Sequence, residues 1–175
     1  MIERERKYRL DDATAARLRR QLDGLAGPGR TELQDTVHYT DPSGRLARLN
    51  LRLRTTDDRR ELTVKGPRVG AGPSKVREEH TIAFSGDVEH VLEALGLVAD
   101  VRYRKETRIY AVQATKVSLD EVNGLGLFCE IEAPDEAAIE RVAMMLGLGE
   151  ESHEPRGYAR LVRSAGTDRP DDEVQ

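Results

Sequence analysis

The chain has 175 residues, with 28 Lys and Arg against 32 Asp and Glu, four His, one Cys and no Trp. Its charged fraction of 34% exceeds the usual ~25%, but the charges are interleaved with periodic apolar residues, which predicts a folded protein. The single cysteine excludes an internal disulfide and a Cys-based zinc site. The net charge of −4 argues against a general nucleic-acid binder. No apolar run approaches the ~18 residues of a membrane span. We therefore expect a soluble, cytoplasmic protein of one domain, with neither a membrane nor a nucleic acid as partner.

Helix-like and strand-like patterns follow one another along the chain. Apolar residues at helical spacing, bounded by capping and stop residues such as Asp87 and Gly96, predict four helices. Most of the remainder alternates between apolar and polar residues, which predicts strands separated by turns. Residues 166–175 are polar and predict a disordered tail after a folded domain of residues 1–165. The predicted helices span 12–24, 87–96, 135–146 and 157–164, and the clearest strands span 47–54, 60–65, 75–83, 101–110, 116–122 and 127–132.

The number and order of these elements predict an α+β fold. About eight strands permit a closed barrel. The apolar faces of three or four helices need a surface to cover, and the outside of such a barrel would supply it.

Each predicted strand carries its charges on one face. Side chains alternate across a strand, so Leu51 and Leu53 share one face while Arg52 and Arg54 share the other. The simplest interpretation is an open antiparallel sheet with its charged face in water. The distribution of charge favours a second interpretation, because carboxylates concentrate on the first and last strands while cations are spread over the others. That arrangement suits a barrel whose charged faces surround a polyanion and its metal ions.

A barrel with charges inside cannot have a dry lumen. Burying unpaired ions costs several kcal/mol each, so the lumen must hold water, ions and a ligand. Carboxylates are hard oxygen ligands suited to Mg²⁺ or Mn²⁺, and guanidinium and ammonium groups contact phosphate oxygens. The candidate metal ligands are Glu3, Glu5, Asp120, Glu130 and Glu132; the candidate phosphate contacts are Arg52, Arg54, Lys65, Arg77 and either Arg104 or Arg108.

An ordered set of motifs resembles the CYTH superfamily, the triphosphate tunnel metalloenzymes. The resemblance covers roughly residues 1–163. It implies an eight-stranded antiparallel closed barrel with helices outside, a triphosphate bound in the lumen, and dependence on Mg²⁺ or Mn²⁺. The segment from Leu95 to the LDEVNGLG run is similar to the class IV adenylyl cyclase branch, which implies a homodimer. The motifs are Ile2–Lys7 (an ExExK opening), Gln34–Thr36, Asp41–Leu46, Leu51–Arg54, Leu62–Pro67, Arg77–Glu79, Leu119–Phe128, Glu130–Glu132 and Gly157–Tyr158.

The resemblance also bears on individual side chains. Members often have a K-x-R pair on the strand at 101–110, whereas here Thr107 follows Lys105, so which of Arg104, Lys105 and Arg108 faces the phosphates stays open. We expect Glu61 and Glu79 to support the tunnel wall. His38 is expected as a strand or surface residue, Cys129 as core, and Tyr158 as a packing residue near the tunnel wall.

Three functions remain open. A cyclase would convert ATP to cyclic AMP and pyrophosphate, although no residue predicts an adenine pocket. A triphosphatase would use the same charged groups to hydrolyse thiamine triphosphate or inorganic triphosphate, with Lys7 as the catalytic group that helps to activate water. A non-catalytic module would bind a polyphosphate or nucleotide, but its retention of so many carboxylates would be unexpected.

Overall fold

The computed structural model describes residues 2–166, and its eight strands close into an antiparallel barrel in the order β1-β5-β4-β3-β2-β6-β7-β8. This confirms the predicted barrel with helices outside it. No helix of the described residues is long and apolar enough to cross a membrane. The strands are β1 (Ile2–Leu10), β2 (Arg30–Thr40), β3 (Asn50–Thr55), β4 (Arg60–Lys65), β5 (Lys75–Ala83), β6 (Val98–Val112), β7 (Thr115–Val122) and β8 (Gly126–Glu132); the helices are α1 (Asp12–Ala26), α2 (Val88–Ala94), α3 (Glu136–Met145) and α4 (Tyr158–Ala165), with a 3₁₀ turn at Glu150–Ser152.

Aspartates fix the start of the first three helices. The side chains of Asp11, Asp87 and Asp135 each accept a hydrogen bond from the backbone N–H three residues later, which satisfies a donor that the helix itself leaves free. The predicted starts are therefore correct to within about a residue. The strand predicted at 47–54 begins only at Asn50, because residues 44–49 form hydrogen-bonded turns. The predicted tail lies outside the described residues from 167 onward.

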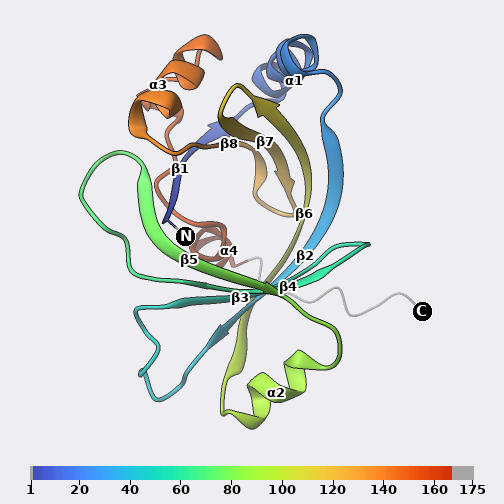
Figure 1. Ribbon diagram of the computed structural model, residues 1–175, viewed down its shortest axis with the longest axis vertical. Helices are drawn as coiled ribbons and strands as arrows, with labels where there is room; N and C mark the ends of the chain where they lie inside the picture. The colour runs from blue at the N-terminus through green and yellow to red at the C-terminus, as the bar shows by residue number, and fades with distance from the viewer. Residues whose placement is uncertain (1, 167–175) are drawn as a thin grey trace.

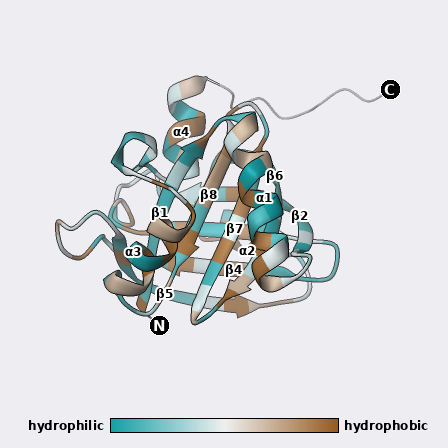
Figure 2. Cartoon of the chain, turned by 90° about the horizontal axis from the view of Figure 1, so that it is seen from above, coloured by the Kyte–Doolittle hydropathy of each residue, from teal (hydrophilic) through white to brown (hydrophobic). Residues whose placement is uncertain are grey.

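Apolar strand faces point outward and are covered by helices. Figure 1 shows α1 and α3 on one side of the barrel and α2 on the opposite side. Leu18 and Leu22 of α1 and Ile139 of α3 pack with Cys129 and Ile131 of β8, and all five are fully buried. Cys129 is thus a core residue, as expected, and burial raises the pKa of its thiol. Figure 2 shows hydrophilic and hydrophobic residues side by side along the barrel strands.

Helix α4 packs across one end of the barrel. Tyr158 and Leu161 contact Val122 and Phe128 at the end where β7 turns into β8. This apolar plug leaves the remaining inner faces of the strands to surround a polar space.

Candidate active site

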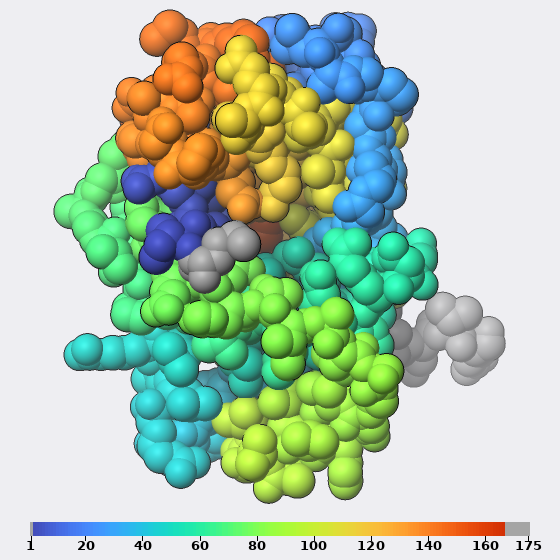
Figure 3. Space-filling model, in the orientation of Figure 1, coloured from blue at the N-terminus to red at the C-terminus, as the bar shows by residue number. Residues whose placement is uncertain are grey.

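The lumen contains a cavity of about 500 Å³, within the range of small-molecule sites. Every strand contributes to its wall, and the segment from residue 155 into α4 forms part of it. In Figure 3 the surface is hollowed beside β1 at the centre of the molecule. The structure brings together these predicted site residues in the wall: Glu3, Glu5, Lys7, Arg52, Arg54, Lys65, Arg77, Glu79, Lys105, Glu130 and Glu132.

Lysines hold the carboxylates of this wall. Both carboxylate oxygens of Glu3 lie 2.6 Å from Lys65 Nζ, which also lies 3.1 Å from Glu79. Glu5 accepts a hydrogen bond from Lys75 Nζ at 2.9 Å. On β8 the same pattern continues: Glu130 lies 3.5 Å from Lys7 Nζ, and Glu132 pairs with Lys116.

These carboxylates also crowd one another. Burial and the neighbouring Glu5 carboxylate raise the pKa of Glu3 to about 7 despite Lys65. Glu5 stands directly opposite Glu132 in the β1–β8 register, a like-charge arrangement that destabilises a sheet unless cations intervene. Burial by itself raises the pKa of Glu5, but Lys75, Lys65 and Lys7 outweigh it and hold that pKa well below its usual range.

Two arginines of the wall, Arg54 and Arg77, lack partners among residues 2–166, and Arg52 lies 4.0 Å from the Glu79 carboxylate. The Nε atoms of Arg52, Arg54 and Arg77 are buried without a hydrogen-bond acceptor. Within residues 2–166, Arg54 and Arg77 form neither a hydrogen bond nor an ion pair with another side chain. Burial and the nearby Arg52 lower the pKa of Arg54. Unpaired guanidinium groups in a desolvated wall fit an anion with several oxygens, such as a chain of phosphates.

Lys7 is held at the inner end of the cavity by the plug segment. Its Nζ donates to the carbonyl oxygen of Arg156 at 2.9 Å and lies 3.6 Å from the centre of the Tyr158 ring. Burial lowers the pKa of Lys7 to about 8, with Lys75 and Lys105 adding to this effect and Glu130 opposing it. A fraction of Lys7 is therefore an uncharged amine near neutral pH, able to accept a proton.

Four predicted site residues lie outside the cavity wall. Of the three candidates on β6, Lys105 faces the cavity, whereas Arg104 pairs with Asp35 on the outer surface and Arg108 lines a groove beside α1. This corrects the inclusion of Arg104 and Arg108 among the phosphate contacts: side chains alternate along β6, so only one parity can face inward.

Asp120 and Glu61 point inward but are already engaged. Asp120 is buried, and its Oδ2 accepts hydrogen bonds from Lys105 Nζ and the Tyr158 hydroxyl, both at 2.7 Å. Glu61 accepts from Arg59 Nε at 3.0 Å, away from the cavity wall. Tyr158 contacts the wall as expected. Its hydroxyl also donates a hydrogen bond to Asp120, and the Lys7 ammonium lies over its ring.

Several wall residues were not among the predicted ones. Lys75 and Lys116 share strand faces with Arg77 and Ser118, so alternation alone could have identified them. His38, expected as a strand or surface residue, lies on β2 but is 7% exposed and lines the cavity. Arg156, Arg160 and Arg163 reach the cavity from the plug segment, and no strand pattern could have placed them there.

The carboxylate oxygens of the cavity are of the kind that binds a divalent cation such as Mg²⁺ or Mn²⁺. Four carboxylates on the adjacent strands β1 and β8 face one cavity, and their mutual repulsion, visible in the raised pKa of Glu3, is what a bound cation relieves. Among residues 2–166 no three acidic, His or Cys side chains converge in a group that could hold an ion, while the lysines occupy the carboxylates.

Comparisons with known proteins agree with this fold and cavity. The CYTH domain model matches residues 1–158, so the chain belongs to the CYTH domain family. A protein of Methanocaldococcus jannaschii named "Putative adenylate cyclase" is 31% identical over 137 residues, covering 75% of this chain and 77% of the relative. A protein structure from Pyrococcus horikoshii is 25% identical with a TM-score of 0.76, covering 93% of this chain and 99% of its own.

A further solved structure shares the fold at lower identity. This Hippeastrum protein, named "Putative adenylyl cyclase" and described as having a dominant triphosphatase activity, is 18% identical with a TM-score of 0.69, covering 97% of this chain and 98% of its own.

Proposed function

We propose that the protein is a metal-dependent adenylyl cyclase that holds the triphosphate of ATP in the barrel cavity and releases cyclic AMP and pyrophosphate. The observation that carries the proposal is the set of guanidinium groups whose buried Nε atoms lack an acceptor among residues 2–166, those of Arg52, Arg54 and Arg77, in a wall that also presents five carboxylates. Cations alone would suffice for a polyphosphate-binding module, so the carboxylates favour an enzyme. The Methanocaldococcus jannaschii relative, named "Putative adenylate cyclase", supports cyclisation over hydrolysis.

The proposed reaction forms one bond and breaks one. The ribose 3′-oxygen attacks the α-phosphorus, the bond from that phosphorus to the bridging oxygen of the β-phosphate breaks, and pyrophosphate leaves with the bonding electrons. Arg52, Arg54, Arg77 and Lys65 bind the β- and γ-phosphates and stabilise the charge that develops on the leaving group. The uncharged fraction of Lys7 accepts the proton of the attacking hydroxyl.

Glu3, Glu5, Glu130 and Glu132 would hold the metal, Mg²⁺ or Mn²⁺. Bound there, it would neutralise phosphate charge and act as a Lewis acid. Asp120 is reserved for Lys105 and Tyr158, and its part in this proposal is to position them.

A second candidate is a triphosphatase acting on thiamine triphosphate or inorganic triphosphate. The lowered pKa of Lys7 favours it equally, because the same amine could take a proton from a water that attacks the terminal phosphorus. The Hippeastrum protein with a dominant triphosphatase activity shares this fold. The two reactions differ in which nucleophile is positioned and in the register of the phosphates.

Product analysis separates these candidates. The purified protein is incubated with ATP, thiamine triphosphate and inorganic triphosphate, each with Mg²⁺ or Mn²⁺, and the products are resolved by chromatography. We expect cyclic AMP and pyrophosphate in equal amounts from ATP. Orthophosphate without cyclic AMP would replace the cyclase with the triphosphatase, and no product from any substrate would leave a binding module. Glu130→Gln should abolish turnover, whereas Glu106→Gln, on the outer face of β6, should not.

A further inference from the structure

One side of the cavity is much less charged than the rest. Its wall on β2 and β6 presents Gln34, His38, Tyr103 and Thr107, which are all uncharged at neutral pH. The one cation of this side, Lys105, is neutralised by Asp120. An inorganic triphosphate carries charge on every phosphate and has no part that such a wall would suit.

His38 presents a hydrogen-bond donor to this side. The Nδ2 amide of Asn50, which can only donate, lies 3.3 Å from His38 Nδ1, so Nδ1 is the acceptor and the proton of the neutral ring sits on Nε2. Burial, together with Arg52, Arg163 and Arg54, lowers the pKa of His38 to about 3, which keeps the ring neutral.

Among residues 2–166 the Nε2–H group has no hydrogen-bond partner. It is buried and unpaired in a side chain that is 93% buried, and an unpaired buried donor costs about 1–3 kcal/mol. The acceptor Gln34 Oε1, on the same strand face, is also buried and unpaired. Unsatisfied polar atoms in a cavity wall indicate that a ligand supplies their hydrogen-bond partners.

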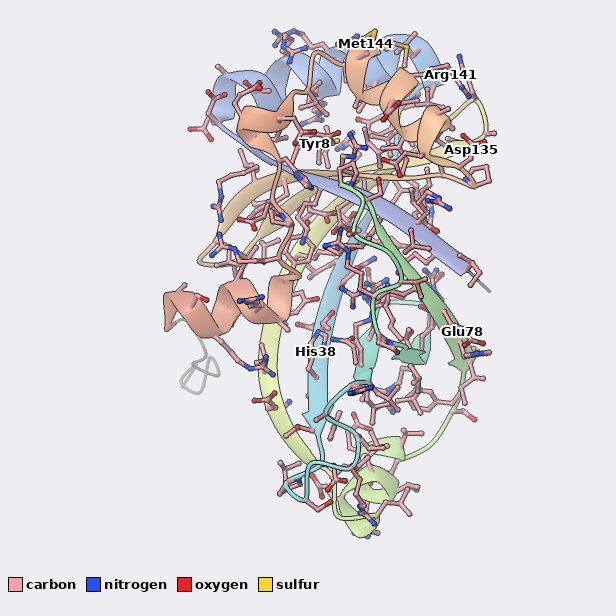
Figure 4. All side chains as sticks on the ribbon, turned by 90° about the vertical axis from the view of Figure 1, so that its left-hand side faces the viewer. Tyr8, His38, Glu78, Asp135, Arg141 and Met144 are labelled. Carbon is pink, nitrogen blue, oxygen red and sulfur yellow. The ribbon has the colours of Figure 1, made fainter. Side chains whose placement is uncertain are left out.

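Aromatic rings and cations flank His38. Its ring stacks with that of Tyr103 at 5.8 Å between centroids and 25° between planes. Across the β2–β3 pair, His38 stands opposite Arg52, whose buried Nε lacks an acceptor among residues 2–166. Figure 4 shows His38 on β2, at a height between α4 and α2. A ligand whose phosphates bind Arg52 can therefore place an adjoining organic group against His38 and Tyr103.

We propose that the wall formed by His38 and Tyr103 is a subsite for a nucleobase, which accepts the in-plane Nε2–H hydrogen bond of His38 through a ring nitrogen or carbonyl oxygen and stacks on the neighbouring Tyr103 ring. The inference rests on the proposed binding of a triphosphate in this cavity and makes the ligand a nucleoside triphosphate. It supplies the base-binding residues that the sequence did not indicate.

The test compares two ligands that bind the same cations. Affinities are measured by calorimetry with Mg²⁺ for analogues of ATP and of inorganic triphosphate in which methylene groups replace the bridging oxygens. We expect wild type to prefer the ATP analogue. His38→Phe keeps the ring and removes the donor, so it should weaken the ATP analogue about three- to tenfold, the range of one hydrogen bond, and leave the inorganic analogue unchanged. His38→Gln, which retains an N–H donor, should recover part of the loss.

A second measurement needs no substitution. In protein labelled with ¹⁵N-histidine, the Nε2–H signal of His38 should shift when the ATP analogue is added and not with the inorganic one. Equal losses for both analogues in His38→Phe, or a signal that ignores the base, would overturn the subsite while leaving triphosphate binding intact. Failure of both analogues to bind would overturn the proposed function as well.

Discussion

Arg54→Met should stabilise the ligand-free protein while weakening triphosphate binding. The guanidinium is desolvated beside Arg52 and has no counter-ion among residues 2–166, and methionine fills similar space without a charge. Leaving a buried polar group unsatisfied costs about 1–3 kcal/mol, more for a charged one. Removing it should therefore raise the melting temperature by roughly 2–4 °C for each kcal/mol gained, as expected for a domain of this size.

The same substitution removes a charged contact to phosphate. Hydrogen bonds to charged groups contribute about 1.5–3 kcal/mol, which corresponds to a roughly 10- to 150-fold loss of affinity for inorganic triphosphate. Stability and affinity should thus move in opposite directions.

Thermal unfolding without ligand and calorimetric titration with inorganic triphosphate measure the two effects. Arg104→Met is the matched control, because Arg104 forms its ion pair with Asp35 on the outer surface, where such pairs contribute little. If Arg54→Met has a lower melting temperature than wild type, or binds triphosphate with the same affinity, Arg54 is not an unpaired group that binds the anion.

Three further predictions concern other groups. The pKa of Glu3 in the folded protein, about 7, lies above its ordinary 4.5, so the folded protein binds that proton more tightly than the unfolded chain and loses stability as pH rises from 4.5 to 7. The melting temperature of Glu3→Gln should therefore rise relative to that of wild type over this interval. Melting temperatures that change in parallel with pH would contradict this. Tyr158→Phe loses the hydrogen bond to buried Asp120 and should cost about 1 kcal/mol in denaturant unfolding, whereas Tyr103→Phe, with no hydroxyl partner among the described residues, should cost less. The Cys129 thiol should resist alkylation in the native protein and react on unfolding, since it is fully buried in the outer core; rapid native labelling would argue against that core.

The strand pattern permitted a closed barrel, and the resemblance to the CYTH superfamily predicted one. Period-two alternation assigns each strand residue to a face, and Cys129 and Ile131 against Glu130 and Glu132 illustrate how cleanly β8 separates core from lumen. The helices had recognisable caps and an outer surface to cover. The predicted homodimer and the predicted use of Mg²⁺ or Mn²⁺ stay predictions.

What alternation cannot supply is the partner of each inward-facing side chain. Asp120 has the parity of a metal ligand, yet its Oδ2 accepts hydrogen bonds from Lys105 on the neighbouring strand β6 and from Tyr158. The Tyr158 contact follows from the position of α4 rather than from the pattern of β7. The His38 ring packs on Tyr103 of β6, which in turn contacts Tyr158 of α4. Long-range contacts made by a plug segment leave no periodic signal in the strands that they cover.

The two kinds of cation divide the work of the cavity. Lysines neutralise the carboxylates: Lys65 holds Glu3, and Lys75 holds Glu5, while Arg54 remains unpaired. The ammonium group of a flexible lysine can move from a carboxylate to a phosphate when a divalent cation takes its place on the carboxylate. The rigid guanidinium fork of an arginine can bind the phosphate without such a rearrangement. A bound metal ion would thus release lysines from the carboxylates so that they can bind phosphate. Bound phosphate would in turn neutralise the charge of the ammonium groups that the metal ion displaced. Their binding should therefore be coupled and reciprocal: each should raise the affinity of the protein for the other by the same factor.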